Sequence, residues 1–175
     1  MLYKDGTLEI SGTGEIAQQA FLRRQDVEKV VINNGITSIG NKAFQGCTSL
    51  TNITIPDSVT SIGSNAFSGC TALTDITIPD SVTSIGNQAF SGCTSLTVII
   101  AIPDSVTRIG NTAFQGCTAL TDVVILAITP PTVGIYIFAS CSMLNGIYVP
   151  PESVEAYKAA KGWHDYASLI EGYPQ

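Results

Sequence analysis

Apolar side chains follow two different spacings within a short stretch near the middle of the chain. Residues 73–78, Leu-Thr-Asp-Ile-Thr-Ile, end in strict alternation of apolar and polar positions, which is typical of a short strand with one buried face. Pro79 ends this run, and Val82 and Ile85 then point inward from an extended turn. We expect residues 86–90 to form a tight helical turn on the outer side, which places Phe90 and Cys93 toward the core.

The same unit recurs along most of the chain with a period of 23 or 24 residues. The segment Ile-Pro-Asp-Ser-Val-Thr-Ser-Ile-Gly occurs at residues 55–63 and 78–86, and again at 102–110 with Arg108 as its one change. Five copies are marked by a phenylalanine: Phe44, Phe67, Phe90, Phe114 and Phe138. A sixth, degenerate copy precedes them and contains Phe21. Because a single unit cannot bury its own apolar face, we expect the units to stack into a solenoid with a parallel sheet along one side.

The ends of the chain predict caps on this stack. Within residues 1–15, Leu8 and Ile10 alternate around a glutamate and predict a strand that covers the first repeat. About six repeats follow in residues 16–150, and residues 151–175 form a C-terminal cap. We therefore expect one domain over residues 1–175.

The C-terminal cap predicts a short helix. Ser153 is placed to cap its N-terminus and Gly162 to end it. Trp163, Tyr166 and Leu169 then supply bulky apolar groups that can cover the last repeat.

Two copies carry extra apolar residues near their strand, at residues 98–102 and 123–128. An extra residue in one strand of a sheet leaves two residues opposite one. We expect a bulge or a register shift at each of these places.

The repeat x-x-I-P-x-S-V-T-x-I-G-x-x-A-F-x-G-C-x-x-L-x-x-I-x-I resembles the BspA-like (Treponema pallidum type) leucine-rich repeats found in many bacterial surface proteins. The segment from Ile147 to Trp163 is similar to the capping segment of many such proteins. The resemblance implies an α/β leucine-rich-repeat solenoid, right-handed, with a parallel sheet on one face, short helical turns on the other and a small C-terminal helical cap. It also implies a non-catalytic adhesion module, extracellular or at the bacterial cell surface, with host matrix or other cell-surface proteins as partners.

Composition narrows the classes of partner. The 175 residues carry a net charge of -6 with only 13% charged residues, whereas nucleic-acid binding depends on clustered Lys and Arg. We therefore expect no nucleic-acid partner. The longest apolar run, residues 123–128, is strand-sized and too short to span a bilayer. The first residues contain no apolar segment of a secretory signal. For the oligomeric state, we expect a monomer.

The cysteines have the spacing of a core position. One occurs in each of five repeats, at Cys47, Cys70, Cys93, Cys117 and Cys141. An odd number of thiols at one repeat position predicts a buried column of free cysteines rather than disulfide bridges. No Cys-x-x-Cys pair or neighbouring histidine completes a zinc site.

Other candidate chemistry favours ordinary structural roles. His164 is the single histidine and has no evident nucleophile or orienting partner. Asp57, Asp80 and Asp104 follow the strand-ending prolines, but one carboxylate per repeat does not supply the clustered oxygens of a calcium site. We expect no metal, no cofactor and no enzymatic activity.

The remaining candidate site is the outward side of the predicted sheet. If Leu50, Ile53 and Ile55 face the core, alternation turns the intervening positions of each repeat outward. The resulting candidate protein-binding residues are Asn52, Thr54, Asp75, Thr77, Val98 and Asp122. This face of other leucine-rich repeats usually binds partners, and the analogy predicts a protein ligand. The alternative is a structural spacer, because the near-identical repeats also suit selection for stacking alone.

Overall fold

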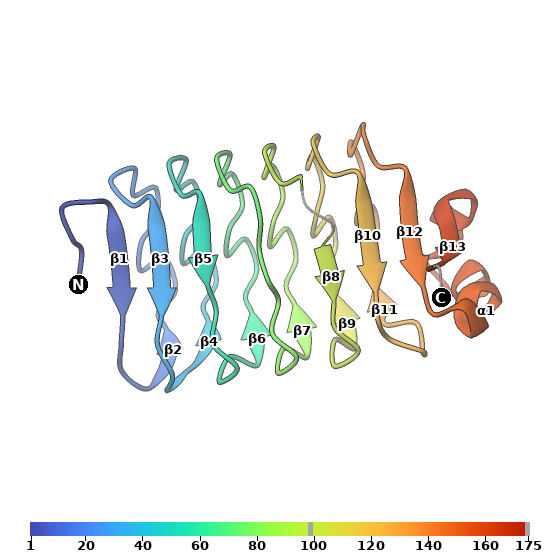
Figure 1. The fold of residues 1–175 in the computed structure, drawn as a ribbon, viewed down its shortest axis with the longest axis horizontal. Helices are drawn as coiled ribbons and strands as arrows, with labels where there is room; N and C mark the ends of the chain where they lie inside the picture. Colours follow the sequence, from blue (N-terminus) through green and yellow to red (C-terminus); the bar gives the residue numbers. More distant parts are fainter. Residues whose placement is uncertain (98–99, 174–175) are drawn as a thin grey trace.

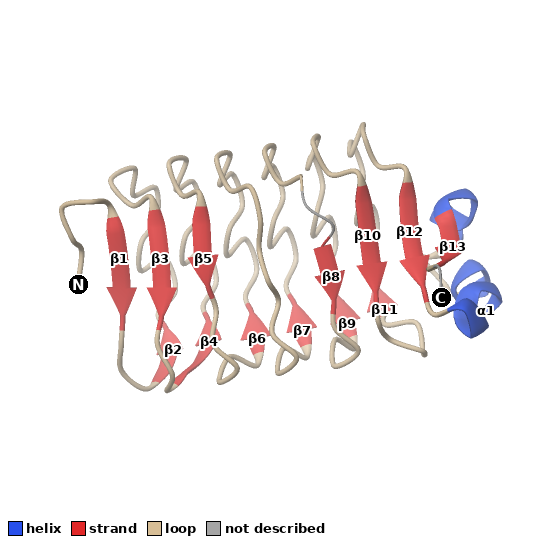
Figure 2. Ribbon diagram, viewed as in Figure 1, coloured by secondary structure: helices blue, strands red, loops and turns tan. Residues whose placement is uncertain are grey.

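The computed structural model describes residues 1–97 and 100–173 and shows a solenoid whose successive turns lie side by side from the N-terminus to the C-terminal helices (Figure 1). Strands line two faces of the solenoid (Figure 2), and we call these the first face and the second face. The first face carries β1 (Thr7–Ile10), β3 (Lys29–Ile32), β5 (Asn52–Thr54), β8 (Ile100–Ile102), β10 (Asp122–Ile125), β12 (Gly146–Val149) and β13 (Ile170–Gly172). The second face carries β2 (Gly14–Ile16), β4 (Ile36–Ile39), β6 (Ser61–Ile62), β7 (Ser84–Ile85), β9 (Arg108–Ile109) and β11 (Thr132–Val133).

The strands pair in parallel with the strand one turn away. Within the described residues, β1, β3 and β5 form one sheet, β8, β10, β12 and β13 a second, and the strands of the second face a third. The pairing places equivalent core residues opposite each other, such as Val30 opposite Ile53 and Ile62 opposite Ile85. The predicted repeat solenoid is confirmed, but the continuous sheet on the second face was not predicted from the inward spacing of Val82 and Ile85.

The core between the two faces is built around a column of phenylalanines. The rings of Phe21, Phe44, Phe67, Phe90, Phe114 and Phe138 stack at centroid separations of 5.2 to 5.6 Å. Tyr166 closes the column edge-on at 5.5 Å from Phe138. Each ring inside the column therefore covers the rings on both sides, which explains why a phenylalanine recurs at this position of every repeat.

The turns that carry these rings alternate local and inter-repeat hydrogen bonds. In one turn the amides of Ala43 and Gln45 donate to the carbonyls three residues earlier, at 3.2 Å. The intervening amides of Phe44 and Gly46 donate instead to carbonyls of the next turn, at 2.8 Å. The expected helical turn is therefore a series of tight turns that are hydrogen-bonded to the adjacent repeat. Lys42, which lies in this segment, has a positive φ of 58°.

A glycine follows five strands of the second face, β4, β6, β7, β9 and β11, because the preceding turn approaches closely there. A Cβ atom at Gly63 would lie 2.8 Å from the backbone nitrogen of Asn41, and one at Gly86 would lie 2.5 Å from that of Ser64. Contacts under 3.0 Å to backbone atoms leave no room for a side chain. The Ile-Gly pair of the repeat therefore sets how closely the turns stack.

The C-terminal cap comprises η1 (Pro151–Ser153), α1 (Val154–Ala159) and η2 (His164–Leu169). The predicted helix is present, but Ser153 makes no side-chain capping hydrogen bond. A 3-10 turn runs directly into the helix, so Ser153 has helical rather than extended backbone angles. Gly162 has the expected positive φ, 84°, three residues after the helix ends.

The extra residues of two repeats lie at different places. Leu96 precedes its equivalent Leu120 by 24 positions, whereas Ile100 pairs with Val123, 23 positions later. The extra residue of this repeat is therefore between Leu96 and Ile100. Part of the bulge predicted over residues 98–102, namely 98 and 99, lies outside the described residues.

The predicted bulge over residues 123–128 is wrong for the strand itself. β10 keeps an unbroken register with β8 up to Ile125 and with β12 up to Val124. The extra residue is in the following loop, residues 126–131, because Ile125 precedes Gly134 by nine positions where Ile102 precedes Gly110 by eight. A loop can take up an added residue without breaking the ladder of hydrogen bonds, which is why the strand is regular.

Candidate functional site

Five of the six predicted surface residues lie in the described part of the first face. Asn52 and Thr54 are exposed on β5, Thr77 is exposed and Asp75 half-buried on the next turn, and Asp122 is half-buried on β10. The sixth predicted residue, Val98, lies outside the described residues. The described residues share one face but belong to three structurally different segments.

The first face is interrupted between β5 and β8. In the described part of the chain, β5 pairs with β3 alone and β8 with β10 alone. Residues 75–78 lie between them without forming a strand, and no backbone hydrogen bond joins them to β5. The last backbone contact before the gap runs from the Thr74 amide to the Thr51 carbonyl at 3.3 Å.

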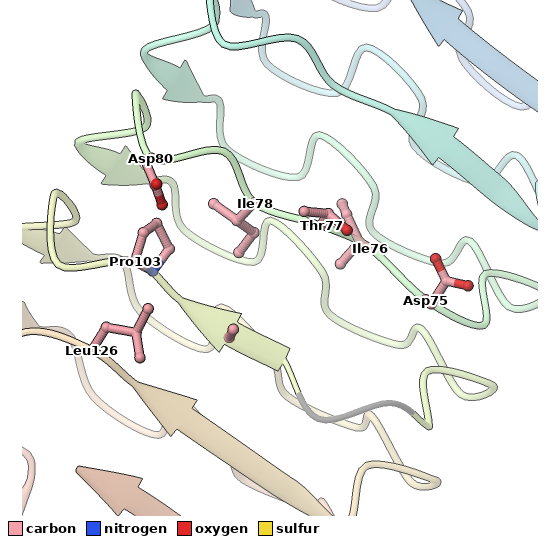
Figure 3. Close-up of a pocket in the computed structure, with 8 residues that line it drawn as sticks. Asp75, Ile76, Thr77, Ile78, Asp80, Pro103 and Leu126 are labelled. Atoms are coloured by element: carbon pink, nitrogen blue, oxygen red, sulfur yellow. The ribbon is translucent and has the colours of Figure 1, made fainter. Parts of the chain in front are cut away.

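A hollow of about 350 Å³, the first hollow, lies at this interruption (Figure 3). Its apolar floor comes from three consecutive turns and consists of Ile76, Ile78, Ala101, Pro103 and Leu126. Asp75 lies at one end of the residue 75–80 segment and Asp80 at the other, as Figure 3 shows. The site thus combines an apolar floor with carboxylates at its margin.

A second hollow, of about 460 Å³, lies beside the enlarged loop at residues 126–131. It is lined on one side by Ile128, Pro130 and Pro131 and on the other by Asp104 and Val106. Because Leu126 borders the first hollow and Ile128 the second, the loop is the wall between them.

Sequence reasoning found only part of this site. It identified Asp75 and Thr77 from alternation, but not Asp80, Pro103 or Leu126. The extra apolar residues at 123–128 were the signal that this repeat differs from the others. Alternation could not show that they extend a loop toward the preceding turn.

The electrostatics of the site are one-sided. No lysine or arginine occurs between Lys42 and Arg108, or between Arg108 and Lys158. Arg108, on β9 of the second face, pairs with Thr132, which lines the second hollow. Among the described residues the ion pairs are Arg24 with Asp26 and His164 with Asp165, so neither Asp75 nor Asp80 forms an ion pair there.

The cysteine column is confirmed as a structural feature of the core. Each thiol donates to the carbonyl of the phenylalanine one turn earlier, for example Cys70 Sγ to Phe44 O at 3.1 Å and Cys93 Sγ to Phe67 O at 3.2 Å. All five cysteines are free thiols, and Cys141 at the end of the column is only half-buried. Burial raises the pKa of Cys70, and it raises the pKa of Cys93 to about 12.

These raised pKa values predict a loss of stability in alkaline solution. Above about pH 8.5, the ordinary thiol pKa, the unfolded chain releases thiol protons that the folded chain retains. The free energy of unfolding should then fall by about 1.4 kcal/mol per pH unit for each such thiol. Urea titrations at pH 7.5, 8.5 and 9.5 measure this slope. A variant with Cys70→Ala and Cys93→Ala should show a shallower slope, and an unchanged slope would contradict the account.

Across residues 1–97 and 100–173 there is no group of three or more His, Cys, Asp or Glu side chains that could hold a metal ion. His164 is exposed in the cap, with Nε2 at 3.1 Å from the carboxylate of Asp165. No helix in the described ranges is long and apolar enough to cross a membrane.

Comparisons with known proteins identify similar repeat proteins from bacteria. The family model of the BspA type leucine rich repeat region matches residues 14–145 in six copies. A leucine-rich repeat protein from Bacteroides ovatus is 34% identical with a TM-score of 0.74, over 83% of this chain and 40% of that chain. The leucine rich repeat protein of T. pallidum is 28% identical with a TM-score of 0.71, over 79% and 78%.

A leucine rich cell surface protein from Faecalibacterium prausnitzii shares the fold at 24% identity and a TM-score of 0.50, over 90% of this chain and 62% of that chain. The chain spans less than half of the length of the Bacteroides ovatus protein described above. A search of curated protein sequences gave no match.

Proposed function

This chain belongs to the BspA-type leucine-rich-repeat family, and from that membership we propose that it is a protein-binding module of a bacterial cell-surface or secreted protein that adheres to host or other cell-surface proteins. Proteins of this repeat fold are generally non-catalytic, and the fold suggests a protein-interaction module. The description of the Faecalibacterium prausnitzii neighbour as a cell surface protein supports the proposed location.

The observation that carries the proposal is the first face with its outward residues. Asn52, Thr54 and Thr77 are exposed there, and Asp75 and Asp122 are partly exposed. The outward positions vary mildly, from Asn52 to Asp75 and Asp122, while the core positions beneath them stay apolar. Exposed polar side chains on a fixed scaffold suit the recognition of a partner.

The alternative function is a structural spacer. The repeated Ile-Pro-Asp-Ser-Val-Thr segment is explained by its own packing, since Val59 and Val82 are fully buried. The Ser81 hydroxyl also donates to the Val59 carbonyl one turn earlier, at 2.6 Å. Stacking alone therefore accounts for the most uniform part of the repeat, and the distinction depends on binding.

Binding to immobilised fibronectin, fibrinogen, collagen and laminin tests the proposal. We expect saturable binding to at least one of them at concentrations up to about 100 μM, which corresponds to about 5.5 kcal/mol. A variant with Asp75→Lys and Asp122→Lys should bind at least about 10-fold more weakly, because it reverses charge on the first face.

The matched control is Glu15→Lys with Glu155→Lys, which changes the net charge equally but lies on β2 and α1. Equal weakening in the two variants would mean that net charge, not the first face, governs binding. Absence of binding to all four proteins would contradict adhesion to these matrix proteins and favour the spacer.

A further inference from the structure

The loop at residues 126–131 is held in place from both sides. The Leu126 amide donates to the Ile102 carbonyl at 2.9 Å, a bond that the prolines at the equivalent positions of earlier repeats cannot make. From the cap, the Tyr157 hydroxyl donates to the Ala127 carbonyl at 2.7 Å and Trp163 Nε1 donates to the Pro131 carbonyl at 2.8 Å. Both aromatic rings are fully buried. The wall between the two hollows is therefore preorganised.

This fixed loop presents apolar side chains to solvent. Leu126 is 42% exposed and Ile128 is 64% exposed, although neighbouring Ile125 and Ala127 are buried in the core. Burial of Ala127 is enough to anchor the loop, so the residues on either side of it could be polar without loss of that anchor. Exposed apolar groups on a rigid wall beside two hollows are typical of a contact surface for another molecule.

The carboxylates at the edge of the two hollows favour a positively charged partner. Asp80 borders the first hollow and Asp104 the second, both exposed and at the same position of successive repeats. Neither carboxylate takes part in an ion pair of the described structure. A lysine or arginine of a partner would meet these carboxylates without displacing a cation of the chain, whereas an acidic partner would be repelled.

We propose that the two hollows beside the 126–131 loop bind an extended cationic peptide segment of a partner protein, in which basic residues flank an apolar residue. The apolar side chain contacts Ile78, Pro103 and Leu126, and the basic side chains reach Asp80 and Asp104. Alternate residues of an extended chain point to opposite sides, so neighbouring residues can serve the floor and the margin. This inference rests on the proposed protein-binding function and names the chemistry of the partner.

Fluorescence anisotropy with three labelled peptides tests the inference. The peptide GSKLKLKSG should bind the full chain with a dissociation constant below about 1 mM, equivalent to about 4.1 kcal/mol. The peptides GSELELESG and GSKSKSKSG, which lack the cations or the apolar groups, should bind at least about 5-fold more weakly. Equal binding of GSKSKSKSG would overturn the proposal, since it would show attraction by charge alone. So would absence of GSKLKLKSG binding at 1 mM.

Variants locate the binding. Asp80→Asn with Asp104→Asn, and separately Leu126→Ser, should each weaken GSKLKLKSG binding by about 5-fold or more. The matched control is Asp57→Asn with Glu155→Gln: it removes the same charge, and Asp57 holds the same repeat position one turn before the first hollow. Equal weakening by the control would overturn the assignment to the hollows. Urea titration of every variant verifies that the fold is retained.

The proposed adhesion function and the proposed peptide site can be contradicted independently of each other. If a matrix protein binds and Leu126→Ser leaves that binding unchanged, while GSKLKLKSG does not bind, the module binds proteins but not through these hollows. If GSKLKLKSG binds in the hollows and none of the four matrix proteins does, the hollows recognise a cationic segment and the proposed adhesion to those proteins is wrong.

Discussion

Replacement of Phe67 by alanine is expected to lower the free energy of unfolding by about 3–5 kcal/mol. The ring is fully buried and stacks on Phe44 and Phe90 with both centroids at 5.4 Å. Truncation leaves a cavity in the middle of the column, and the neighbouring rings cannot close it because each is bonded through its turn to the next repeat. Urea titration followed by circular dichroism measures the change.

Phe21→Ala is the control for this prediction. Phe21 stacks on Phe44 at 5.2 Å but is only half-buried at the end of the column. Its truncation should cost less than that of Phe67, since part of its apolar area is already in contact with water. A loss below about 1 kcal/mol for Phe67→Ala would contradict the column as the centre of the core.

Gly86→Ala is expected to destabilise the fold by about 3 kcal/mol, at the upper end of the usual cost of overpacking. The added Cβ would lie 2.5 Å from the Ser64 nitrogen and 2.6 Å from the Gly63 carbonyl carbon. Both are backbone atoms of the adjacent turn, and they cannot move without separating the strands of the second face. The change should therefore lower the urea midpoint far more than a surface substitution does.

Gly69→Ala separates this clash from backbone strain. Gly69 has a positive φ of 73°, and a Cβ there would meet Gly46 Cα at an ordinary 3.8 Å. The expected cost is about 1–2 kcal/mol, from the left-handed conformation alone. Equal destabilisation by the two alanines would mean that the close approach at Gly86 is relieved by a small shift of the turns.

Several features of the fold could be predicted from the sequence because the repeat period is a local and strong signal. The spacing of the phenylalanines marked five repeats from Phe44 to Phe138, and the cysteines at one repeat position predicted the column that the structure contains. The cap was placed correctly as well, because Tyr166 and Trp163 are too large and apolar to remain in water. The capping role of Ser153 was wrong because the preceding 3-10 turn is not visible in composition.

The interrupted first face is a result that only the tertiary structure decided. Residues 50–55 and 73–78 have nearly the same sequence, Leu-Thr-x-Ile-Thr-Ile, yet the first contains β5 and the second contains no strand. A strand needs a partner in register, and no backbone hydrogen bond joins residues 75–78 to β5. Pairing is thus a property of two neighbouring turns, which one segment cannot specify.

The sequence by itself determined the period, the inward positions and the caps, since these depend on burial within one turn and its immediate neighbours. The tertiary structure alone decided where the sheet ends, which way the 126–131 loop faces and which carboxylates lie beside it. The buried rings of Tyr157 and Trp163 bond to that loop from 30 and 32 residues away. The stacking of three successive turns, rather than local pattern, brings Asp80, Pro103 and Leu126 to one hollow.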